Sequence, residues 1–222
     1  MSLKHTYIYI FFFSCVTSST TKQFTLMLDP AGDAQITGKI IGNAFERGIT
    51  LQCAQELKQQ LERLDKTVRV ILTRFPGETV QYLQHANFAN RLGVDLFIHL
   101  AFFQSSIHTL HCFYYCTHPI TDYWQKTSYK LTFIPSSQAH CAALKTSVWY
   151  SDYISNYIKN TYHTTITVQK SLGIPYKPLH GILAPAIALE MGIQSAQDRA
   201  LYVQPLAESI TNALRYLRKK EI

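Results

Sequence analysis

The fold is decided by Pro185-Ala-Ile-Ala-Leu-Glu190-Met-Gly192, an apolar run that ends in a carboxylate and a glycine. The run predicts a buried strand, because short apolar stretches bounded by proline and glycine are typical of strands inside a sheet. In open α/β sheets, ligands gather beyond the carboxyl ends of the strands. We therefore expect Glu190 on the edge of a sheet that carries a binding site.

The chain before this stretch alternates between strand and helix patterns. Apolar runs predict strands, and apolar residues at three- and four-residue intervals predict helices with one buried face. The expected strands are residues 24–28, 68–73, 94–101, 111–117 and 185–190, and the expected helices are 44–64, 79–92, 150–162 and 205–220. The order predicts an α/β fold with a mostly parallel, twisted sheet of about five or six strands and helices on both faces.

Length and composition fit one domain, which we place at residues 21–222. The 222 residues are 47% hydrophobic, which is enough for a full core. Within this domain, residues 118–145 are rich in Thr, Ser, Pro and Tyr and lack periodicity, so we expect an irregular surface excursion.

The charge balance is basic, with 21 Lys and Arg against 14 Asp and Glu and a net charge of +7. Such a charge either serves solubility or attracts an anionic partner, and charge alone does not decide between the two. The cations do not form a run interleaved with aromatics, and the C-terminal group from Arg215 to Lys220 complements the dipole of a predicted helix. We therefore expect no nucleic-acid partner.

The first residues have the pattern of an export signal. Lys4 and His5 precede the apolar run 7–13, and small or polar residues follow, so residues 1–20 are predicted to be a cleaved signal peptide. The run is too short for a membrane span, which needs about 20 apolar residues. Phe12-Phe-Ser-Cys15 distantly resembles a lipoprotein processing site, so lipidation is an alternative.

Four carboxylates are expected at one rim. Asp29 and Asp33 follow the first strand, Glu46 opens the first helix and Glu190 ends the last strand. A second interpretation of Glu46 is a favourable charge at a helix N-terminus, worth about 0.3–1 kcal/mol.

Six motifs in register resemble the zinc-dependent N-acetylmuramoyl-L-alanine amidases, a family of peptidoglycan hydrolases. They are Asp29-Pro30, Glu46, Thr73-Arg74, Ala89-Asn90, Asp95-Leu-Phe-Ile98 and Pro185-Ala186 through Glu190-Met-Gly192. The resemblance implies that Glu46 is a Zn²⁺ ligand and that Glu190 is the general base for the attacking water. It also implies peptidoglycan or muropeptide as the partner and a location in the periplasm or at the cell wall.

The sequence departs from the family at both histidine ligands. Gly32 stands at the first ligand position, where the family has Asp-Pro-Gly-His-Gly, and Ala101 stands at the second. Neither side chain can donate an electron pair, and one carboxylate cannot hold Zn²⁺ at useful affinity. The inherited zinc site is therefore expected to be broken, with no cofactor as one outcome.

A shifted site is an alternative to the broken one. His99 lies two residues before Ala101 and faces the same side of the strand, about 6.6 Å away, so it could join Asp33 and Glu46 around a metal. The opposing interpretation is a buried histidine bonded to a neighbouring strand.

Three hypotheses follow for function. The chain is a peptidoglycan hydrolase with a weakened or relocated zinc site, or an inactive relative that binds cell-wall fragments or a partner protein. In the third, the resemblance is only a shared α/β layout, and Glu46 and Glu190 lie well apart.

Overall fold

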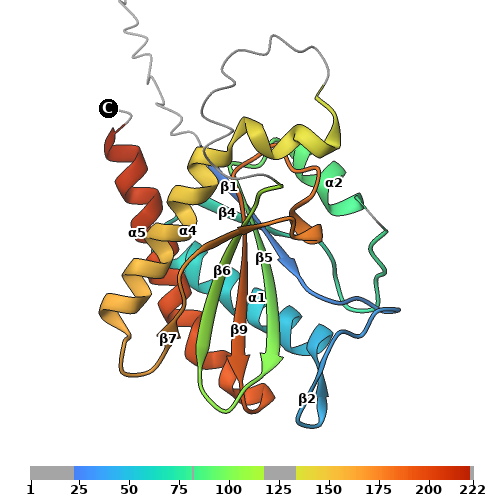
Figure 1. Cartoon of the computed structure of the whole chain (residues 1–222), viewed down its shortest axis with the longest axis vertical. Helices are drawn as coiled ribbons and strands as arrows, with labels where there is room; N and C mark the ends of the chain where they lie inside the picture. The colour runs from blue at the N-terminus through green and yellow to red at the C-terminus, as the bar shows by residue number, and fades with distance from the viewer. Residues whose placement is uncertain (1–22, 82, 118–133, 221–222) are drawn as a thin grey trace, which may run out of the picture.

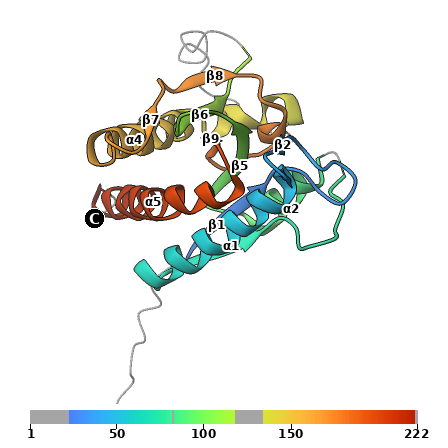
Figure 2. The ribbon, with the colours of Figure 1, turned by 90° about the horizontal axis from the view of Figure 1, so that it is seen from below.

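A central sheet with helices on both faces forms the molecule, as shown by a computed structural model that describes residues 23–81, 83–117 and 134–220 (Figures 1 and 2). Across the sheet the strand order is β4-β1-β5-β9-β6-β7, and β8 pairs with β6 on the same edge as β7. Because β7 and β8 share one edge, the described sheet is six strands wide, as the sequence predicts.

The elements have the following bounds. The sheet strands are β1 (Phe24–Pro30), β4 (Val68–Leu72), β5 (Leu96–Gln104), β6 (Thr109–Tyr115), β7 (Thr167–Val168), β8 (Leu172–Ile174) and β9 (Ala186–Ile193). A separate hairpin consists of β2 (Ile40–Ile41) and β3 (Ala44–Phe45). The α-helices are α1 (Glu46–Leu64), α2 (Gln84–Leu92), α4 (Leu144–Thr161) and α5 (Ala200–Lys220). The 3₁₀ turns are η1 (Ser136–Ala142), η2 (Lys177–Leu179) and η3 (Ala196–Arg199).

Strands β4, β1, β5 and β9 run parallel, and β6 is antiparallel to β9. This confirms the predicted mostly parallel sheet. In register, Asp29 of β1 lies opposite His99 of β5, and Ala101 of β5 lies opposite Glu190 of β9. The carboxyl ends of the three central strands are therefore side by side.

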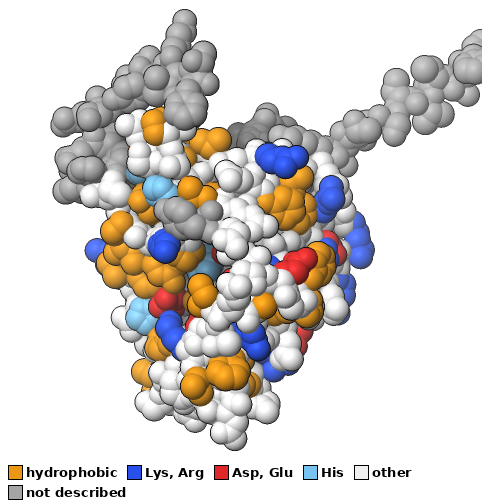
Figure 3. All heavy atoms as spheres, turned by 90° about the vertical axis from the view of Figure 1, so that its right-hand side faces the viewer, with side chains coloured by type: hydrophobic (Ala, Val, Ile, Leu, Met, Phe, Trp, Pro, Cys, Tyr) orange, Lys and Arg blue, Asp and Glu red, His pale blue; other side chains and the backbone are white. Residues whose placement is uncertain are grey.

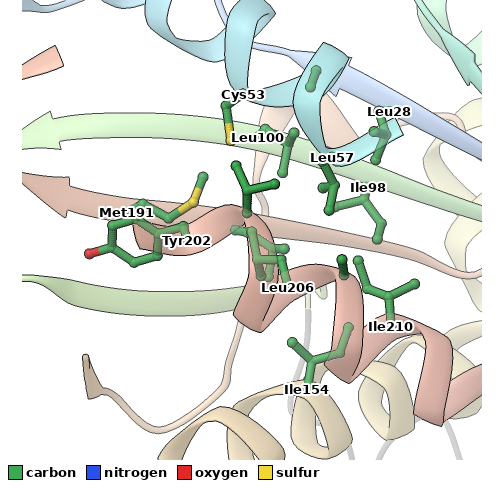
Figure 4. Packing of buried hydrophobic residues seen from close by; sticks show 14 of the residues in the cluster. Leu28, Cys53, Leu57, Ile98, Leu100, Ile154, Met191, Tyr202, Leu206 and Ile210 are labelled. Carbon is green, nitrogen blue, oxygen red and sulfur yellow. The ribbon is translucent and has the colours of Figure 1, made fainter. Parts of the chain in front are cut away.

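Two hydrophobic clusters cover the two faces of the sheet. On one face α1, α4 and α5 pack against strand residues such as Leu28, Ile98 and Leu100 (Figures 2 and 4). On the other face α2 and the turn before β9 form a smaller cluster. Toward the carboxyl ends of the strands, this cluster extends as far as Phe97 on β5 and Ala188 on β9. The part of this face near Ala101 and Glu190 is left for the candidate site.

Some element bounds differ from the predicted ones. Helix α1 begins at Glu46 because Ala44 and Phe45 pair with β2. Helix α2 begins at Gln84 instead of residue 79, after Leu83 in the left-handed region at φ 63°. The closing helix begins at Ala200, five residues before Pro205. Pro205 thus lies inside the helix, where it has no N–H group to donate to the carbonyl of Leu201.

The predicted terminal and surface segments are described only in part. The predicted signal peptide, Cys15 and the boundary at residue 20 lie outside the described residues. Of the predicted excursion at 118–145, residues 118–133 lie outside the described residues, and residues 134–145 contain η1 and the start of α4. No described helix is long and apolar enough to cross a membrane.

Candidate functional site

Glu46 is a buried carboxylate with both oxygens bonded to backbone. The residue is only 4% exposed to solvent. Oε2 accepts the N–H of Lys39 at 2.9 Å, and Oε1 accepts the N–H of Phe102 on β5 at 2.9 Å. Glu46 therefore ties the segment before β2 to the central sheet, which is more than a favourable charge at a helix start.

The segment over Glu46 comes close because position 38 is glycine. Gly38 has φ +74°, and a Cβ added there would lie 2.7 Å from Glu46 Oε2. The backbone N–H of Glu46 in turn donates to the carbonyl of Lys39 at 2.8 Å. Residues 38 and 39 thus form a strap across this carboxylate, and we refer to them as the strap.

Asp29 and His99 form a buried pair across β1 and β5. Asp29 Oδ2 lies 2.7 Å from His99 Nδ1, and the Thr73 hydroxyl donates to Asp29 Oδ1 at 2.6 Å. Burial favours the neutral acid, but the hydrogen bond and charge of His99, with further help from Thr73, hold the pKa of Asp29 below its usual value. An ionised Asp29 accepts the proton on Nδ1 of His99, which leaves Nε2 for another partner.

Asp33 accepts backbone hydrogen bonds from its own loop and from a second loop. Oδ1 accepts the N–H groups of Gln35 and Ile36 at 2.8 and 2.6 Å, and Oδ2 accepts the N–H of Val80 at 3.1 Å. Burial opposes ionisation, yet these bonds lower the pKa of Asp33. The residue pins two loops together.

Glu190 lies at the surface end of the site, with its side chain 22% exposed. The Tyr176 hydroxyl donates to Oε1 at 2.6 Å, and Lys39 Nζ lies 3.8 Å from the same oxygen. Burial first, then the bond to Glu190 and the charges of Glu46 and Asp29, raise the pKa of Tyr176, so the phenol stays protonated and donates. Glu46 bonds the N–H groups of Lys39 and Phe102, and Lys39 also pairs with Glu190, which rules out the hypothesis that Glu46 and Glu190 lie far apart.

Tyr176 and Lys39 were not predicted as site residues. Tyr176 precedes η2 in a segment of prolines, and Lys39 lies in the strap, so neither carries a motif. Their place depends on how loops meet over the sheet, which local periodicity does not report.

The two histidine positions of the family face different surroundings. Gly32 has φ +74°, and a Cβ added there would lie 2.9 Å from Arg47 Cβ and 3.0 Å from the Ile36 carbonyl. Ala101 is 2% exposed beside Glu190. A side chain at position 32 would meet backbone strain and close contacts.

The predicted substitutes do not converge on a common point. Across residues 23–81, 83–117 and 134–220, no three His, Cys, Asp or Glu side chains form a group that could hold a metal ion. His99 is 6% exposed and bonded to Asp29 on the next strand, which confirms the interpretation as a buried, strand-bonded histidine. As arranged, Asp33, Glu46 and His99 do not fit a zinc ion.

The face that carries this rim is hollowed near its centre (Figure 3). A histidine is visible in the hollow, with hydrophobic side chains on one flank and acidic and basic side chains close by. The site thus combines apolar walls with charged groups at the carboxyl ends of parallel strands, where α/β proteins bind ligands.

A family model described as N-acetylmuramoyl-L-alanine amidase matches residues 26–216. The chain belongs to this family. The match covers every rim residue named above, from Asp29 to Glu190, and confirms the family resemblance of the sequence motifs. A comparison with curated protein sequences found no match.

Solved amidase structures share the fold at low sequence identity. One from Clostridium difficile 630 has a TM-score of 0.62 at 18% identity, covering 90% of this chain and 100% of that one. One from Mycobacterium smegmatis has a TM-score of 0.61 at 14% identity, covering 87% and 97%. The CwlD amidase from Clostridioides difficile, in complex with the GerS lipoprotein, has a TM-score of 0.59 at 16% identity, covering 87% and 98%.

Proposed function

We propose that this amidase-family chain is exported, binds peptidoglycan fragments and does not hydrolyse them. The observation that carries the proposal is the state of Glu46, whose two carboxylate oxygens accept N–H groups from Lys39 and Phe102. By resemblance, this glutamate would be a zinc ligand. In this chain both carboxylate oxygens instead accept backbone hydrogen bonds that stabilise the fold.

The chemistry of the family requires more than Glu46 offers. A catalytic zinc site needs three protein ligands and an open position for water. Of the implied set, Gly32 and Ala101 provide no donor atoms. Turning Glu46 toward a metal would also leave the buried N–H of Phe102 unpaired, at about 1–3 kcal/mol, and would break the partly buried bond from Lys39.

The rest of the rim supports binding. Glu190 keeps partial exposure, His99 presents an acceptor nitrogen, and the Tyr176 hydroxyl fixes the Glu190 side chain. The family acts on peptidoglycan, and a rim that keeps its place at the strand ends can hold a fragment after the metal is gone. A wall ligand also agrees with export by the predicted signal peptide.

Metal content and hydrolysis test the proposal together. The full chain would be purified, dialysed against zinc and assayed by mass spectrometry, then incubated with muropeptides beside an active family amidase. We expect substoichiometric zinc, no released stem peptide, and calorimetric binding with a dissociation constant of roughly 1 μM to 1 mM. One zinc per chain with release of stem peptide would establish the hydrolase hypothesis. If the chain does not bind muropeptides, the proposal that it binds peptidoglycan fragments is refuted.

A further inference from the structure

Two side-chain atoms at the rim have no hydrogen-bond partner among the described residues. Nδ1 of His99 bonds Asp29 and leaves Nε2, and Tyr176 bonds Glu190 Oε1 and leaves Oε2. Within the described part of the chain neither atom has a hydrogen-bond partner, and neither is among the fully buried polar atoms that lack one. Glu190 Oε2 can therefore accept a hydrogen bond from a ligand, and His99 Nε2 can do so in the tautomer that carries its proton on Nδ1.

Aromatic rings line the same rim. Phe103 of β5 meets His111 of β6 edge-on with centroids 5.6 Å apart, and His111 stacks on Phe113 at 6.1 Å. Phe113 stacks on Tyr176 at 5.6 Å, and Tyr176 contacts His99 at 5.8 Å. We call these five rings the aromatic wall, and all except His99 are half-buried, so part of their surface is available to a ligand.

The chain already places one ammonium group at this wall. Lys39 Nζ lies 5.9 Å from the centroid of Phe103 and 3.8 Å from Glu190 Oε1. Its side chain is 50% exposed. A surface ion pair of this kind is worth about 0–1 kcal/mol, so Lys39 can leave at little cost.

The charges favour a cation over an anion as the ligand. The Tyr176 hydroxyl experiences the carboxylates of Glu190, Glu46 and Asp29, and Lys39 is the cation paired with Glu190. A primary ammonium has three donors and no acceptor, which matches a rim with two free acceptors and ring faces. An anionic group would be repelled by Glu190.

We propose that this rim binds the primary ammonium group of a ligand, between Glu190, His99 and the aromatic wall, with Lys39 as a displaceable internal competitor. The inference rests on the proposed function for the identity of the ligand. In a wall fragment, the group would be the side-chain ammonium of a basic diamino acid in the peptide.

Two muropeptides test the inference by calorimetry with the full chain. One carries a diamino acid with a free side-chain ammonium, and the other carries the same residue acetylated. We expect the free form to bind about tenfold more tightly, as one charge-assisted hydrogen bond provides. Glu190→Gln should remove this preference, with thermal melting as the check on folding.

The Lys39→Met variant gives the sharpest test, because removing a side chain from the binding site is expected to increase the affinity for the ligand. Removing the internal competitor should tighten binding of the free-ammonium fragment by about threefold to tenfold and leave the acetylated fragment unchanged. Lys66→Met is the matched control, since Lys66 is exposed on the turn between α1 and β4 and carries the same charge. It should change neither affinity.

The outcomes separate the inference from the proposed function. Equal affinity of the wild type for both fragments, or weaker binding after Lys39→Met, would overturn the ammonium site and leave fragment binding intact. If neither fragment binds, the proposed function fails, and pentylammonium then tests the site by its effect on the NMR signals of the His99 ring. Unchanged signals would overturn the inference.

Discussion

Glu46 and Glu190 both bind Lys39, one through its backbone N–H and the other through its ammonium group, and yet they occupy opposite environments. Glu46 is buried, with each oxygen bonded to a backbone N–H group from the strap or from β5. Glu190 reaches solvent and has one oxygen bonded to Tyr176. A carboxylate that completes the backbone hydrogen bonding is committed to the fold, whereas one with a free oxygen at a rim can still meet a ligand.

The largest expected effect separates these two residues by stability. Glu46→Ala should lower the free energy of unfolding by about 3–5 kcal/mol, because the buried N–H of Phe102 and the partly buried N–H of Lys39 lose their carboxylate partner. Glu190→Ala should cost less than about 1 kcal/mol, since solvent reaches its site. Urea denaturation at neutral pH measures both, and a similar small loss in the two variants would remove the contrast.

Asp29 extends the comparison to a third carboxylate. Asp29→Asn should cost about 3 kcal/mol at neutral pH, because the charged bonds to His99 and Thr73 are weakened. The folded pKa of Asp29 is depressed, so its contribution is full above the ordinary carboxyl pKa and is lost as the pH falls through the folded value.

The measurement is urea unfolding of both proteins over a pH series. The gap between wild type and Asp29→Asn should narrow below about pH 4. Asp152→Asn, an exposed position on α4, is the control and should show little change. A gap that stays constant with pH would contradict the ionised state of Asp29.

The sequence was sufficient for the sheet and for the position of the rim. The apolar runs at β1, β5 and β9 placed Asp29, His99 and Glu190 on neighbouring strands, and the structure has them there, although β9 continues past Glu190 to Ile193. Local patterns carry this information, because a buried parallel strand needs a continuous apolar run.

The roles at the rim could not be predicted to the same depth. For Glu46 the sequence indicated a zinc ligand or a favourable charge at a helix start, since no pattern shows that Gly38 lets the strap approach its carboxylate. Tyr176 lies 14 residues from Glu190 in sequence and bonds it through loop packing. Contacts made between loops depend on tertiary geometry, so sequence periodicity gives no sign of them.

A third prediction tests whether position 32, where the family has its first histidine ligand, can accept a side chain. Gly32→Ala should cost about 2 kcal/mol, because a left-handed residue is strained and its Cβ would crowd Arg47. Gly42→Ala is the control, since Gly42 has φ +57° with open space around it, and it should cost only about 1 kcal/mol. Equal losses in thermal unfolding would show that crowding at position 32 is unimportant.

The smallest expected effect concerns the hydroxyl that holds Glu190. Tyr176→Phe should cost about 1 kcal/mol at neutral pH through the lost hydrogen bond. The folded pKa of Tyr176 is raised, so its contribution is full below the ordinary phenol pKa and is lost above about pH 10, as the pH rises through the folded value. Chemical denaturation at rising pH checks this, and a cost that persists at high pH would argue against the bond.

The central claim is that Glu46 serves the fold and holds no metal. A ligand that binds the native state raises its stability by about 2.7 kcal/mol at a concentration of 100 times its dissociation constant. The direct measurement is the unfolding free energy of the full chain over a zinc titration, with Glu46→Gln in parallel. We expect no zinc dependence in the wild type. A saturable increase that disappears in Glu46→Gln would contradict the claim.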